Sequence, residues 1–500
     1  IITELIMNNT KNIAVIGSGL AGISAASYLA KNGYKVTVYE KNETYGGRLQ
    51  QFTSNGFTFD MGPSWYWMPD IFESYFNDFN HTTADYYELN RLNPGYRIYY
   101  GKDDYLDIVE NIDELKSLFD SVEPNSGESL QHFLDDAKIK YEIAMKHFIY
   151  RPSLSFKEYI DPIIISKLGK LNLFKSMSKH IRQYFSDSKL IQMLEFPSLL
   201  LGAKPGNTPS MYSLMNYADI CLGTWYPKGG IRSIATAMYD NSLDLDVKYR
   251  FSCPIDKIHL TNSKKNVNGI ECNGEFFETD ILLVNGDYQY IEQKLLPSNL
   301  SNYSKKYWDK RVFSPSSLIF YIGLNKKIKN IQHHMLFFDT SFNSHAQQIY
   351  DNPSWPSDPL FYVSCTSKSD TNTAPENGET LFVLIPTANG LNDSDEIRDK
   401  FFNIIIDRIE NNIGESIKNN IVFQRSYAHR DFTKDFNTMN GNAYGLANTL
   451  MQSAFLKPKM KNKKIDNLYY TGQLTVPGPG MPPSIISGKI AADLISKEHD

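Results

Sequence analysis

Apolar residues at the start of the chain follow a strand–helix–strand pattern. Residues 12–16 (Asn-Ile-Ala-Val-Ile) predict a short buried strand, and the small apolar residues 23–30 predict a helix. Between them lies a glycine-rich turn, residues 17–22 (Gly-Ser-Gly-Leu-Ala-Gly), and residues 34–39 predict a second strand that ends on Glu40. This order of strand, glycine turn, helix, strand and acid is typical of a dinucleotide-binding β-α-β unit.

Each part of this unit has a physical role. Gly17 allows a sharp turn, Gly19 lets a pyrophosphate approach the backbone, and Gly22 lets the helix pack closely on the strand. The helix N-terminus presents free N–H groups and a positive dipole end to the phosphates. Glu40 lies 18 residues after Gly22, where it can bind ribose hydroxyls. An acid there favours an unphosphorylated adenosine ribose, as in FAD or NAD, over NADP.

Further along the chain, the pattern changes to alternating strands and longer helices. The alternation in residues 317–324, 361–365 and 380–386 predicts a second sheet, which we interpret as the floor and lid of a substrate cavity. The remaining predicted elements are a hairpin at 96–100 and 105–109, helices at 112–122, 129–148, 231–240, 395–410 and 484–495, and strands at 251–258, 280–287 and 466–472.

Composition limits the class of protein. A chain of 500 residues exceeds one ordinary domain, which suggests two domains that are interleaved in sequence. The residues are 41% hydrophobic and 21% charged, which is typical of a globular protein, and the 13% of aromatic residues are enough to line a large apolar cavity. The net charge of -5 gives no indication of nucleic-acid binding.

Cysteine and histidine spacing suggests no metal site. The four cysteines are far apart and form no Cys-x-x-Cys motif, so we expect neither a zinc site nor a disulfide, as in a reducing cytosol. The ten histidines show no metal-ligand spacing, and we expect the His333–His334 pair at the surface.

Residues 162–201 provide the sequence evidence on whether the protein associates with a membrane. No apolar run approaches the ~18 residues that span a bilayer, and no signal peptide precedes the first strand. Basic residues are interspersed in an apolar series that starts at Ile163, which predicts a helix that either lies in a membrane interface or packs on the core with a solvated basic face. The basic residues are Lys167, Lys170, Lys175, Lys179 and Arg182.

Four further segments carry a family resemblance. Gly46-Gly47-Arg48, the Phe-Asp-Met-Gly-Pro run at 59–63, the aromatic-Pro-Lys-Gly-Gly step at 226–230 and the C-terminal stretch 472–483 are similar to motifs of the bacterial carotenoid (phytoene) desaturases. These are FAD-dependent oxidoreductases of the amine oxidase-like superfamily. The resemblance runs nearly end to end, from Asn12 to about Leu494.

The resemblance implies how FAD binds. Arg48 would lie along the pyrophosphate, and the strand near Ile255 would meet the adenine. The C-terminal helix would point its N-terminus at the flavin ring, where the dipole stabilises negative charge on the reduced ring. Residues 472–475 (Gly-Gln-Leu-Thr) depart from the usual Gly-Ala-Gly-Thr, so the contacts of that turn stay open. The predicted cofactor-binding residues are Gly17, Gly19, Leu20, Ala21, Gly22, Glu40, Lys41, Gly47, Arg48, Leu49, Gly62, Pro63, Ser64, Ile255, Gly472, Gly480 and Met481.

The implied fold is α/β. A Rossmann-like FAD-binding domain (residues 11–95, 225–300 and 420–500) would be interleaved with an α+β substrate domain (96–150 and 301–419). Residues 151–224 would form a helical subdomain that binds substrate and faces the membrane. The implied location is cytoplasmic, peripherally attached to the cytoplasmic membrane.

The implied reaction is desaturation of a hydrophobic polyene, with phytoene converted toward lycopene in carotenoid biosynthesis. A hydride would pass from an allylic carbon to flavin N5, a proton would be lost nearby, and a quinone or oxygen would take up the electrons. Glu158 matches an acid that sits beside the substrate cavity in the family, and a buried carboxylate there could take the proton, although a surface glutamate is the alternative. The aromatic run 65–67 either walls an apolar tunnel or belongs to the core.

Other functions remain open on this scaffold. A hydroxycarotenoid 3,4-desaturase or a carotenoid isomerase would use the same motifs. An amine oxidase is less favoured because the shared features extend beyond the FAD motif. A non-catalytic prenyl-lipid carrier, like the GDP-dissociation inhibitors, is disfavoured by the intact flavin-facing residues 478–481.

Overall fold

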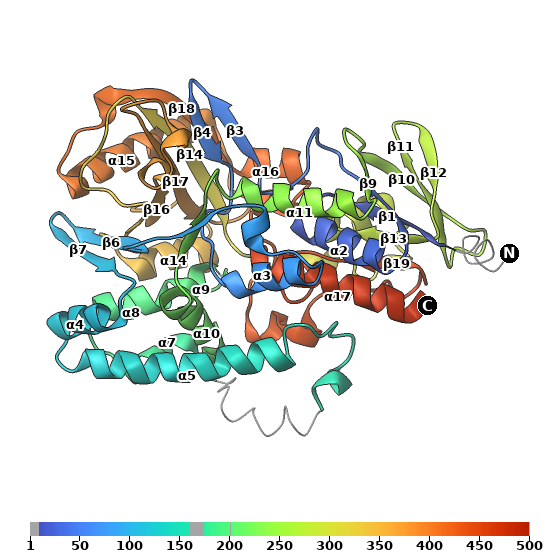
Figure 1. Cartoon of the computed structure of the whole chain (residues 1–500), viewed down its shortest axis with the longest axis horizontal. Coiled ribbons are helices and arrows are strands. Elements are labelled where there is room, and N and C mark those ends of the chain that lie inside the picture. The colour runs from blue at the N-terminus through green and yellow to red at the C-terminus, as the bar shows by residue number, and fades with distance from the viewer. Residues whose placement is uncertain (1–9, 161–174, 201, 500) are drawn as a thin grey trace.

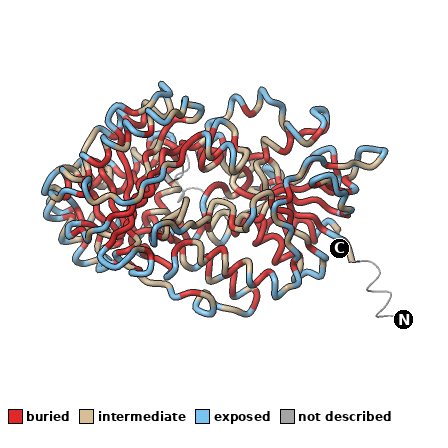
Figure 2. The backbone as a smooth tube through the Cα atoms, turned by 90° about the horizontal axis from the view of Figure 1, so that it is seen from above, coloured by how far each residue is buried: buried red, intermediate tan, exposed pale blue. Residues whose placement is uncertain are grey.

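The computed structural model describes residues 10–160, 175–200 and 202–499 (Figure 1). The predicted amphipathic helix lies partly outside these residues, since Lys167 and Lys170 fall in the gap. Buried backbone gathers in two regions at opposite ends of the molecule (Figure 2), and each region contains one of the two large sheets described below.

Within the described residues, a five-stranded parallel sheet joins segments from the start, middle and end of the chain. The strand order is β19-β13-β1-β2-β9, and every neighbouring pair is parallel. Because β13 lies between β1 and β19, the two ends of the chain flank one central strand. The strands are β1 (Asn12–Ile16), β2 (Lys35–Tyr39), β9 (Lys248–Arg250), β13 (Ile281–Val284) and β19 (Leu468–Tyr470).

Two helices from opposite ends of the chain pack together beside this sheet (Figure 1). Helix α2 (Leu20–Lys31) is buried from Leu20 to Leu29 because its residues are small or apolar on every face. Helix α17 (Met481–His499) crosses it closely: a β-carbon on Gly488 would collide with the Ala21 carbonyl oxygen, and Ser24 Oγ donates to the Ile485 carbonyl at 2.8 Å. Helices α2 and α17 therefore form one packed unit.

A second, larger sheet forms the other end of the described structure. Its order is β18-β14-β17-β16-β15-β6-β7, with neighbours antiparallel except β15 and β6. Helix α15 (Asp395–Ile413) contributes Phe401, Ile405 and Ile409 to the core beneath it. The strands are β6 (Tyr96–Gly101), β7 (Asp104–Ile108), β14 (Ser316–Leu324), β15 (His334–Phe337), β16 (Phe361–Ser364), β17 (Glu379–Thr387) and β18 (Ile421–Tyr427).

Strand β18 corrects one domain boundary. The sequence grouped residues 420–500 with the FAD-binding domain, but β18 pairs with β14 from Ile319↔Tyr427 to Leu324↔Ile421. The sequence of this strand is compatible with either domain, and only the strand with which it pairs shows the domain to which it belongs. Residues 421–427 therefore belong with the larger sheet.

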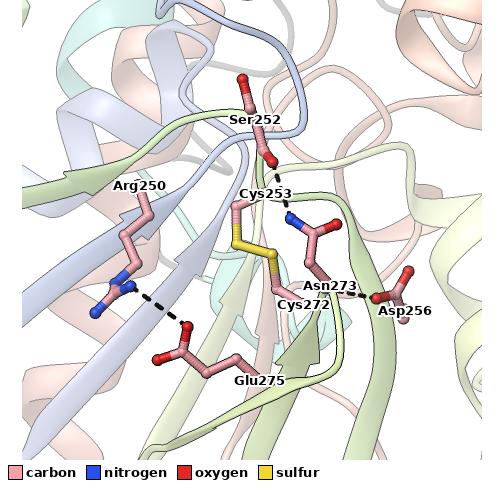
Figure 3. The surroundings of a disulfide bond; sticks show 7 residues. All are labelled: Arg250, Ser252, Cys253, Asp256, Cys272, Asn273 and Glu275. Carbon is pink, nitrogen blue, oxygen red and sulfur yellow. Dashed lines mark hydrogen bonds and ion pairs between the residues drawn. A yellow bond between two sulfur atoms is a disulfide. The ribbon is translucent and has the colours of Figure 1, made fainter.

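A disulfide closes the small three-stranded sheet β10 (Ile255–Leu260), β11 (Val267–Cys272) and β12 (Glu275–Glu278) (Figure 3). Cys253 and Cys272 are bonded, with Cα atoms 5.6 Å apart, so the prediction of no disulfide was wrong. The antiparallel register places Cys272 opposite Ile255, which brings the two cysteines together across 19 residues of sequence. Spacing along the chain does not reveal such a register.

Helices and short strands complete the described fold. Of the predicted interface segment, Met177 and Ile181 in α7 are fully buried, whereas Lys179 is exposed. No helix among the described residues is long and apolar enough to span a bilayer. These elements are α3 (Pro69–Asn77), α4 (Ile112–Val122), α5 (Ser126–His147), α7 (Met177–Ile181), α8 (Ser188–Glu195), α9 (Pro197–Leu200), α10 (Leu214–Asn216), α11 (Arg232–Asp244), α12 (Tyr288–Tyr290), α13 (Lys305–Trp308), α14 (Phe342–Tyr350), α16 (His429–Phe436), β3 (Gln51–Ser54), β4 (Phe57–Asp60), β5 (Leu89–Arg91) and β8 (Trp225–Pro227).

Candidate active site

A cavity of about 670 Å³ connects the two sheets. At one end it is lined by the glycine turn after β1, by Glu40 and by Ile255. At the other end, which we call the apolar arm, the lining residues are uncharged and mostly aromatic or aliphatic. The volume lies within the range of sites that hold a cofactor or substrate. The apolar arm comprises Trp65, Trp67, Met68, Phe196, Leu199, Met215, Leu336, Phe338, Phe342, Ile349, Tyr350, Leu360 and Tyr362.

The glycine turn leaves no room for side chains. Gly17 has a φ of +96° and bonds through its N–H to the Tyr39 carbonyl at 2.8 Å, which ties the turn to β2. A β-carbon on Gly47 would lie 2.9 Å from the Gly19 Cα, so the two backbone segments nearly touch at the cavity wall. No side chain caps α2, whose N-terminus therefore presents its N–H groups toward the cavity.

Glu40 links the glycine turn to the end of β2. It is buried, and its carboxylate accepts hydrogen bonds from Ser18 N and Ser18 Oγ, both at 2.8 Å, and from Asn42 N at 2.9 Å. A carboxylate has about four acceptor positions, so one remains for a ligand hydroxyl. Since Glu40 also lines the cavity, the geometry fits a ribose held at this end.

Arg48 provides the test of whether the residues fit a dinucleotide. Its Nε donates to the Ala443 carbonyl at 2.7 Å, and its guanidinium lies 4.7 Å from the ring centre of Phe436. Nη2 is buried and has no hydrogen-bond partner among the described residues. Burial lowers the pKa of Arg48. An unpaired cationic N–H at a cavity wall that also carries a helix N-terminus suits a diphosphate, so these residues fit the pyrophosphate of FAD.

The C-terminal segment reaches the same cavity. Gly472, which follows β19, Gly480, which precedes α17, and Met481, which begins it, all line the cavity. Pro482 and Pro483 occupy the first turn of α17, where their missing N–H groups are tolerated. The positive end of the α17 dipole therefore meets the cavity that α2 also meets.

The predicted cofactor residues lie together with one exception. Gly22 does not line the cavity; a β-carbon there would collide with the Gly17 carbonyl oxygen, which is the close packing expected of it. The other predicted residues all line the cavity, and their contacts with FAD stay predictions. They are Gly17, Gly19, Leu20, Ala21, Glu40, Lys41, Gly47, Arg48, Leu49, Gly62, Pro63, Ser64, Ile255, Gly472, Gly480 and Met481.

Two residues at the end of β13 were missing from the predicted site. Asn285 Nδ2 donates to the Gly17 carbonyl at 3.1 Å and so braces the glycine turn. Asp287 caps α12 by accepting from Tyr290 N at 2.9 Å, and burial raises its pKa to about 6. Both line the cavity. The sequence could have indicated both residues, because they follow a predicted strand and the carboxyl ends of neighbouring parallel strands meet at one edge of a sheet.

The aromatic run 65–67 serves both of the roles considered for it. Trp65 and Trp67 line the apolar arm. Tyr66 is fully buried away from it, and its hydroxyl lies 2.9 Å from that of Tyr87. The run therefore contributes two rings to the cavity and one to the core.

Glu158 is not among the residues that line the cavity, which favours the alternative of a glutamate outside the site, and its role in catalysis stays a prediction. Its carboxylate accepts backbone N–H bonds from Ser153 at 2.9 Å, Leu154 at 2.6 Å and Ser155 at 3.0 Å. These bonds cap the short 3₁₀ helix Phe156–Tyr159, so Glu158 stabilises its own loop.

The His333–His334 pair was wrongly predicted to be exposed. The two side chains are buried, because β15 lies inside the larger sheet between β16 and β6. The imidazole of His334 stacks on Trp65 with ring centres 4.2 Å apart. Burial lowers the pKa of His333 to about 3 and that of His334 well below its ordinary value, so both are neutral near pH 7.

Comparison with known proteins agrees with this geometry. The model of the family described as flavin containing amine oxidoreductase matches residues 20–496. A carotenoid 3,4-desaturase of Haloarcula japonica is 36% identical over 489 residues, which cover 98% of each chain. A 4,4'-diapophytoene desaturase (4,4'-diaponeurosporene-forming) of Staphylococcus haemolyticus is 30% identical over 97% of this chain and 99% of its own.

A solved structure shows the same fold at lower identity. The crystal structure of an oxidoreductase from Methanosarcina mazei superposes with a TM-score of 0.62 at 16% identity, and the match covers 96% of this chain and 99% of the other.

Proposed function

This chain belongs to the flavin containing amine oxidoreductase family as a FAD-dependent carotenoid desaturase, and we propose that its substrate is a long acyclic carotenoid bound in the apolar arm. The observation that carries the proposal is the continuity of one cavity from the dinucleotide-binding groups to that arm. A hydrocarbon offers no hydrogen-bonding group, so its site must work through apolar burial and positioning. The uncharged lining of the arm supports this.

The residues of the chain then have separate tasks. Arg48 and the N-terminus of α2 would hold the diphosphate, and Glu40 the ribose. The N-terminus of α17 would stabilise negative charge at the flavin end. Bound FAD supplies a two-electron acceptor for a hydride from an allylic carbon. The aromatic wall of the apolar arm excludes water and holds the polyene in one orientation.

Two positions for the new double bond are supported to different degrees. Conversion of phytoene toward lycopene is the reaction that the family resemblance implies, and the similarity to a diapophytoene desaturase supports it. Desaturation at the 3,4 position is favoured by the higher identity to the Haloarcula protein. We therefore place 3,4-desaturation first and phytoene desaturation second.

One experiment separates these reactions. FAD-loaded protein is incubated with liposomes that contain either phytoene or lycopene, and the pigments are separated by chromatography. A longer chromophore formed from lycopene supports 3,4-desaturation, and lycopene formed from phytoene supports the second candidate. Isomers without new double bonds would indicate an isomerase, and unchanged pigments in both mixtures would refute both proposals.

We further propose that the protein works at the cytoplasmic membrane surface, where its substrate resides. An exposed apolar patch supports this proposal: Phe156 is 59% exposed and Met451 70%. The ring of Phe156 lies 5.3 Å from that of Phe455, and Lys459 Nζ donates to the Ser153 carbonyl at 2.8 Å, which joins the two loops. The patch comprises Phe156, Ile160, Leu450, Met451 and Leu456.

Liposome binding tests this location. The double variant Phe156→Ser/Met451→Ser should sediment less with liposomes than the parent protein does. Val422→Ser is the matched control, because Val422 is 48% exposed but lies on β18. Equal loss in the control would show that exposed apolar area in general, and not this patch, drives binding.

A protein at the membrane surface could pass its electrons to a quinone in the membrane. We propose that a quinone reoxidises the enzyme, with oxygen as the alternative. Anaerobic turnover with an added quinone supports the first acceptor, and turnover that requires air supports the second.

A further inference from the structure

We propose that Asp219 is a positioning residue that fixes the aromatic wall of the apolar arm and thereby selects which bond of the polyene is desaturated. Asp219 acts through Thr224 and Tyr96, and these three residues are not among those that line the cavity. The inference rests on the desaturation proposed above. It adds a means by which the protein distinguishes among the similar bonds of one hydrocarbon chain.

A hydrocarbon substrate can slide along an apolar arm. Sliding changes which carbons meet the flavin, but it breaks no hydrogen bond to the substrate, because a hydrocarbon forms none. Only the shape of the wall can therefore hold the chain at one position. A misplacement of about 1 Å can slow a reaction about 100-fold, so the large rings of the wall need fixed orientations.

The indole of Trp67 is held from behind the wall. Trp67 lines the arm, and its Nε1 donates a hydrogen bond to Thr224 Oγ1 at 2.8 Å. An indole N–H can only donate, so the Thr224 oxygen accepts, and the hydroxyl hydrogen is free for another acceptor. That acceptor is Asp219 Oδ1, at 3.4 Å. The hydrogen bonds therefore run in one direction, from Trp67 through Thr224 to Asp219.

The second carboxyl oxygen of Asp219 holds a ring that packs behind the same wall. The Tyr96 hydroxyl donates to Asp219 Oδ2 at 2.7 Å. Trp65, which lines the arm, contacts both of the rings that are held in this way. Its ring centre is 5.2 Å from that of Trp67 and 5.4 Å from that of Tyr96. One carboxyl group thus fixes two neighbours of Trp65.

The backbone leaves the indole of Trp67 only its rotation. Trp225, the residue after Thr224, donates from its N–H to the Tyr66 carbonyl at 3.1 Å, and Tyr66 immediately precedes Trp67. This bond fixes the distance between the two segments. The side-chain bond from Trp67 to Thr224 then fixes the direction of the ring.

A need to satisfy the Trp67 N–H does not by itself explain the carboxyl group. Thr224 would accept that bond alone, whereas Asp219 adds the cost of a buried acid. Asp219 is 4% exposed, and burial raises its pKa to about 7, although the hydrogen bonds from Tyr96 and Thr224 oppose that rise. Buried polar networks whose members are satisfied make their surroundings rigid. The two bonds of Asp219 therefore suit a role in holding the rings of the wall in place.

The position of the new double bond tests this role in FAD-loaded protein. Thr224→Val keeps the shape of the side chain and removes its hydroxyl, and Asp219→Asn leaves one acceptor oxygen for two hydroxyls. The substrate is the carotenoid that the parent protein desaturates. We expect the ratio of the main product to products with the double bond elsewhere to fall about tenfold, as for loss of one hydrogen bond. KM should stay near the parent value, because the apolar lining is unchanged, and Thr224→Ser should restore the parent ratio.

The variant Tyr87→Phe is the matched control. It removes the hydrogen-bond partner of Tyr66, the neighbour of Trp67, but neither Tyr66 nor Tyr87 lines the cavity. Fluorine NMR follows the ring directly in protein that carries fluorotryptophan at its five tryptophan positions, and Trp67→Phe assigns the signal. We expect one Trp67 signal in the parent protein and in the control. In Thr224→Val and Asp219→Asn the signal should broaden or split.

The proposal is overturned if Thr224→Val and Asp219→Asn keep the parent product ratio, or if Trp67 gives the parent signal in both. An equal change in Tyr87→Phe would assign the effect to packing in general, which also overturns it. Asp219→Asn decides alone if Thr224→Val does not fold. A parent protein that desaturates no carotenoid would refute the proposed function instead, and the fluorine signals would still show whether Asp219 holds the indole.

Discussion

Removal of the Arg48 guanidinium should weaken FAD binding but leave the stability of the free protein nearly unchanged. Arg48→Met keeps the length of the side chain and removes the guanidinium. In the free protein the guanidinium has a buried Nη2 without a partner among the described residues, and the charge of Asp287 offsets only part of the burial cost, so removal of the group ends the remainder of that cost. We therefore expect the free protein to lose less than about 1 kcal/mol of stability, or to gain some, since the loss of one hydrogen bond to Ala443 opposes that gain.

FAD binding, in contrast, should become clearly weaker. Hydrogen bonds to charged groups contribute about 1.5–3 kcal/mol, so the Kd for FAD should rise roughly 10- to 150-fold. Ligand linkage converts this into a stability difference. At a FAD concentration 1,000 times the parent Kd, FAD stabilises the parent by about 4.1 kcal/mol, and a 100-fold weaker variant by about 1.4 kcal/mol.

The assay combines a titration with unfolding. FAD is titrated into the apoprotein by calorimetry, and chemical unfolding is measured with and without FAD. Arg398→Met is the matched control, since Arg398 is also buried but pairs with Asp393 at 2.6 Å and Asp431 at 2.7 Å. The control should lose about 3–5 kcal/mol of stability and keep its FAD affinity. An Arg48→Met protein with the parent Kd, or one as destabilised as the control, would refute this account of the site.

Three further predictions concern single residues. Gly47→Ala should abolish FAD binding, because a β-carbon would lie 2.9 Å from the Gly19 Cα at a φ of +58°; retention of flavin colour in the purified variant would contradict the proposed backbone approach. Glu158→Gln should keep parent turnover of the carotenoid, since the carboxylate caps its own loop; a rate slower by about 100-fold, as for loss of a general base, would return it to the mechanism. Lys457 is buried without a partner for Nζ among the described residues, and burial lowers its pKa to about 7 from 10.5. The unfolded chain therefore binds more protons between pH 7 and 10.5, and Lys457→Met should be more stable at pH 7 by a few kcal/mol, with an advantage that shrinks as the pH rises toward 10. A pH-independent difference in urea unfolding would argue against this.

Local chemistry explains which parts of the site could be predicted from the sequence. The glycine turn and Glu40 lie within one stretch of chain, where the spacing of glycines and the sequence of strand, helix and strand determine the geometry, and the family resemblance adds Arg48 shortly after them. Met481 was predicted from the family resemblance, and the helix predicted from residue 484 in fact begins at Met481, so that the two prolines lie in its first turn. These residues line the cavity as expected.

The features that were missed depend on pairing between distant segments. Cys253 and Cys272 meet only because β10 and β11 adopt one antiparallel register. His334 is buried only because β6, from residues 96–101, pairs along β15, which is far away in sequence. The sequence of either segment alone looks like an ordinary edge strand. A hydrocarbon substrate adds to the difficulty, because its site carries no cluster of charged residues that a motif could reveal.

The order of the parallel sheet links cofactor binding to complete folding. Leu282 of β13 pairs with Ala14 on one side and with Leu468 on the other, so the glycine turn and the α17 N-terminus reach the cavity only after both ends of the chain have paired with the same strand. Such contacts join segments that are far apart in the sequence, and closing the long loops between them costs conformational entropy. FAD bound to the predicted groups from both ends would stabilise the state in which those contacts exist. The cavity predicted to hold the flavin is therefore also the place where segments from both ends of the chain meet.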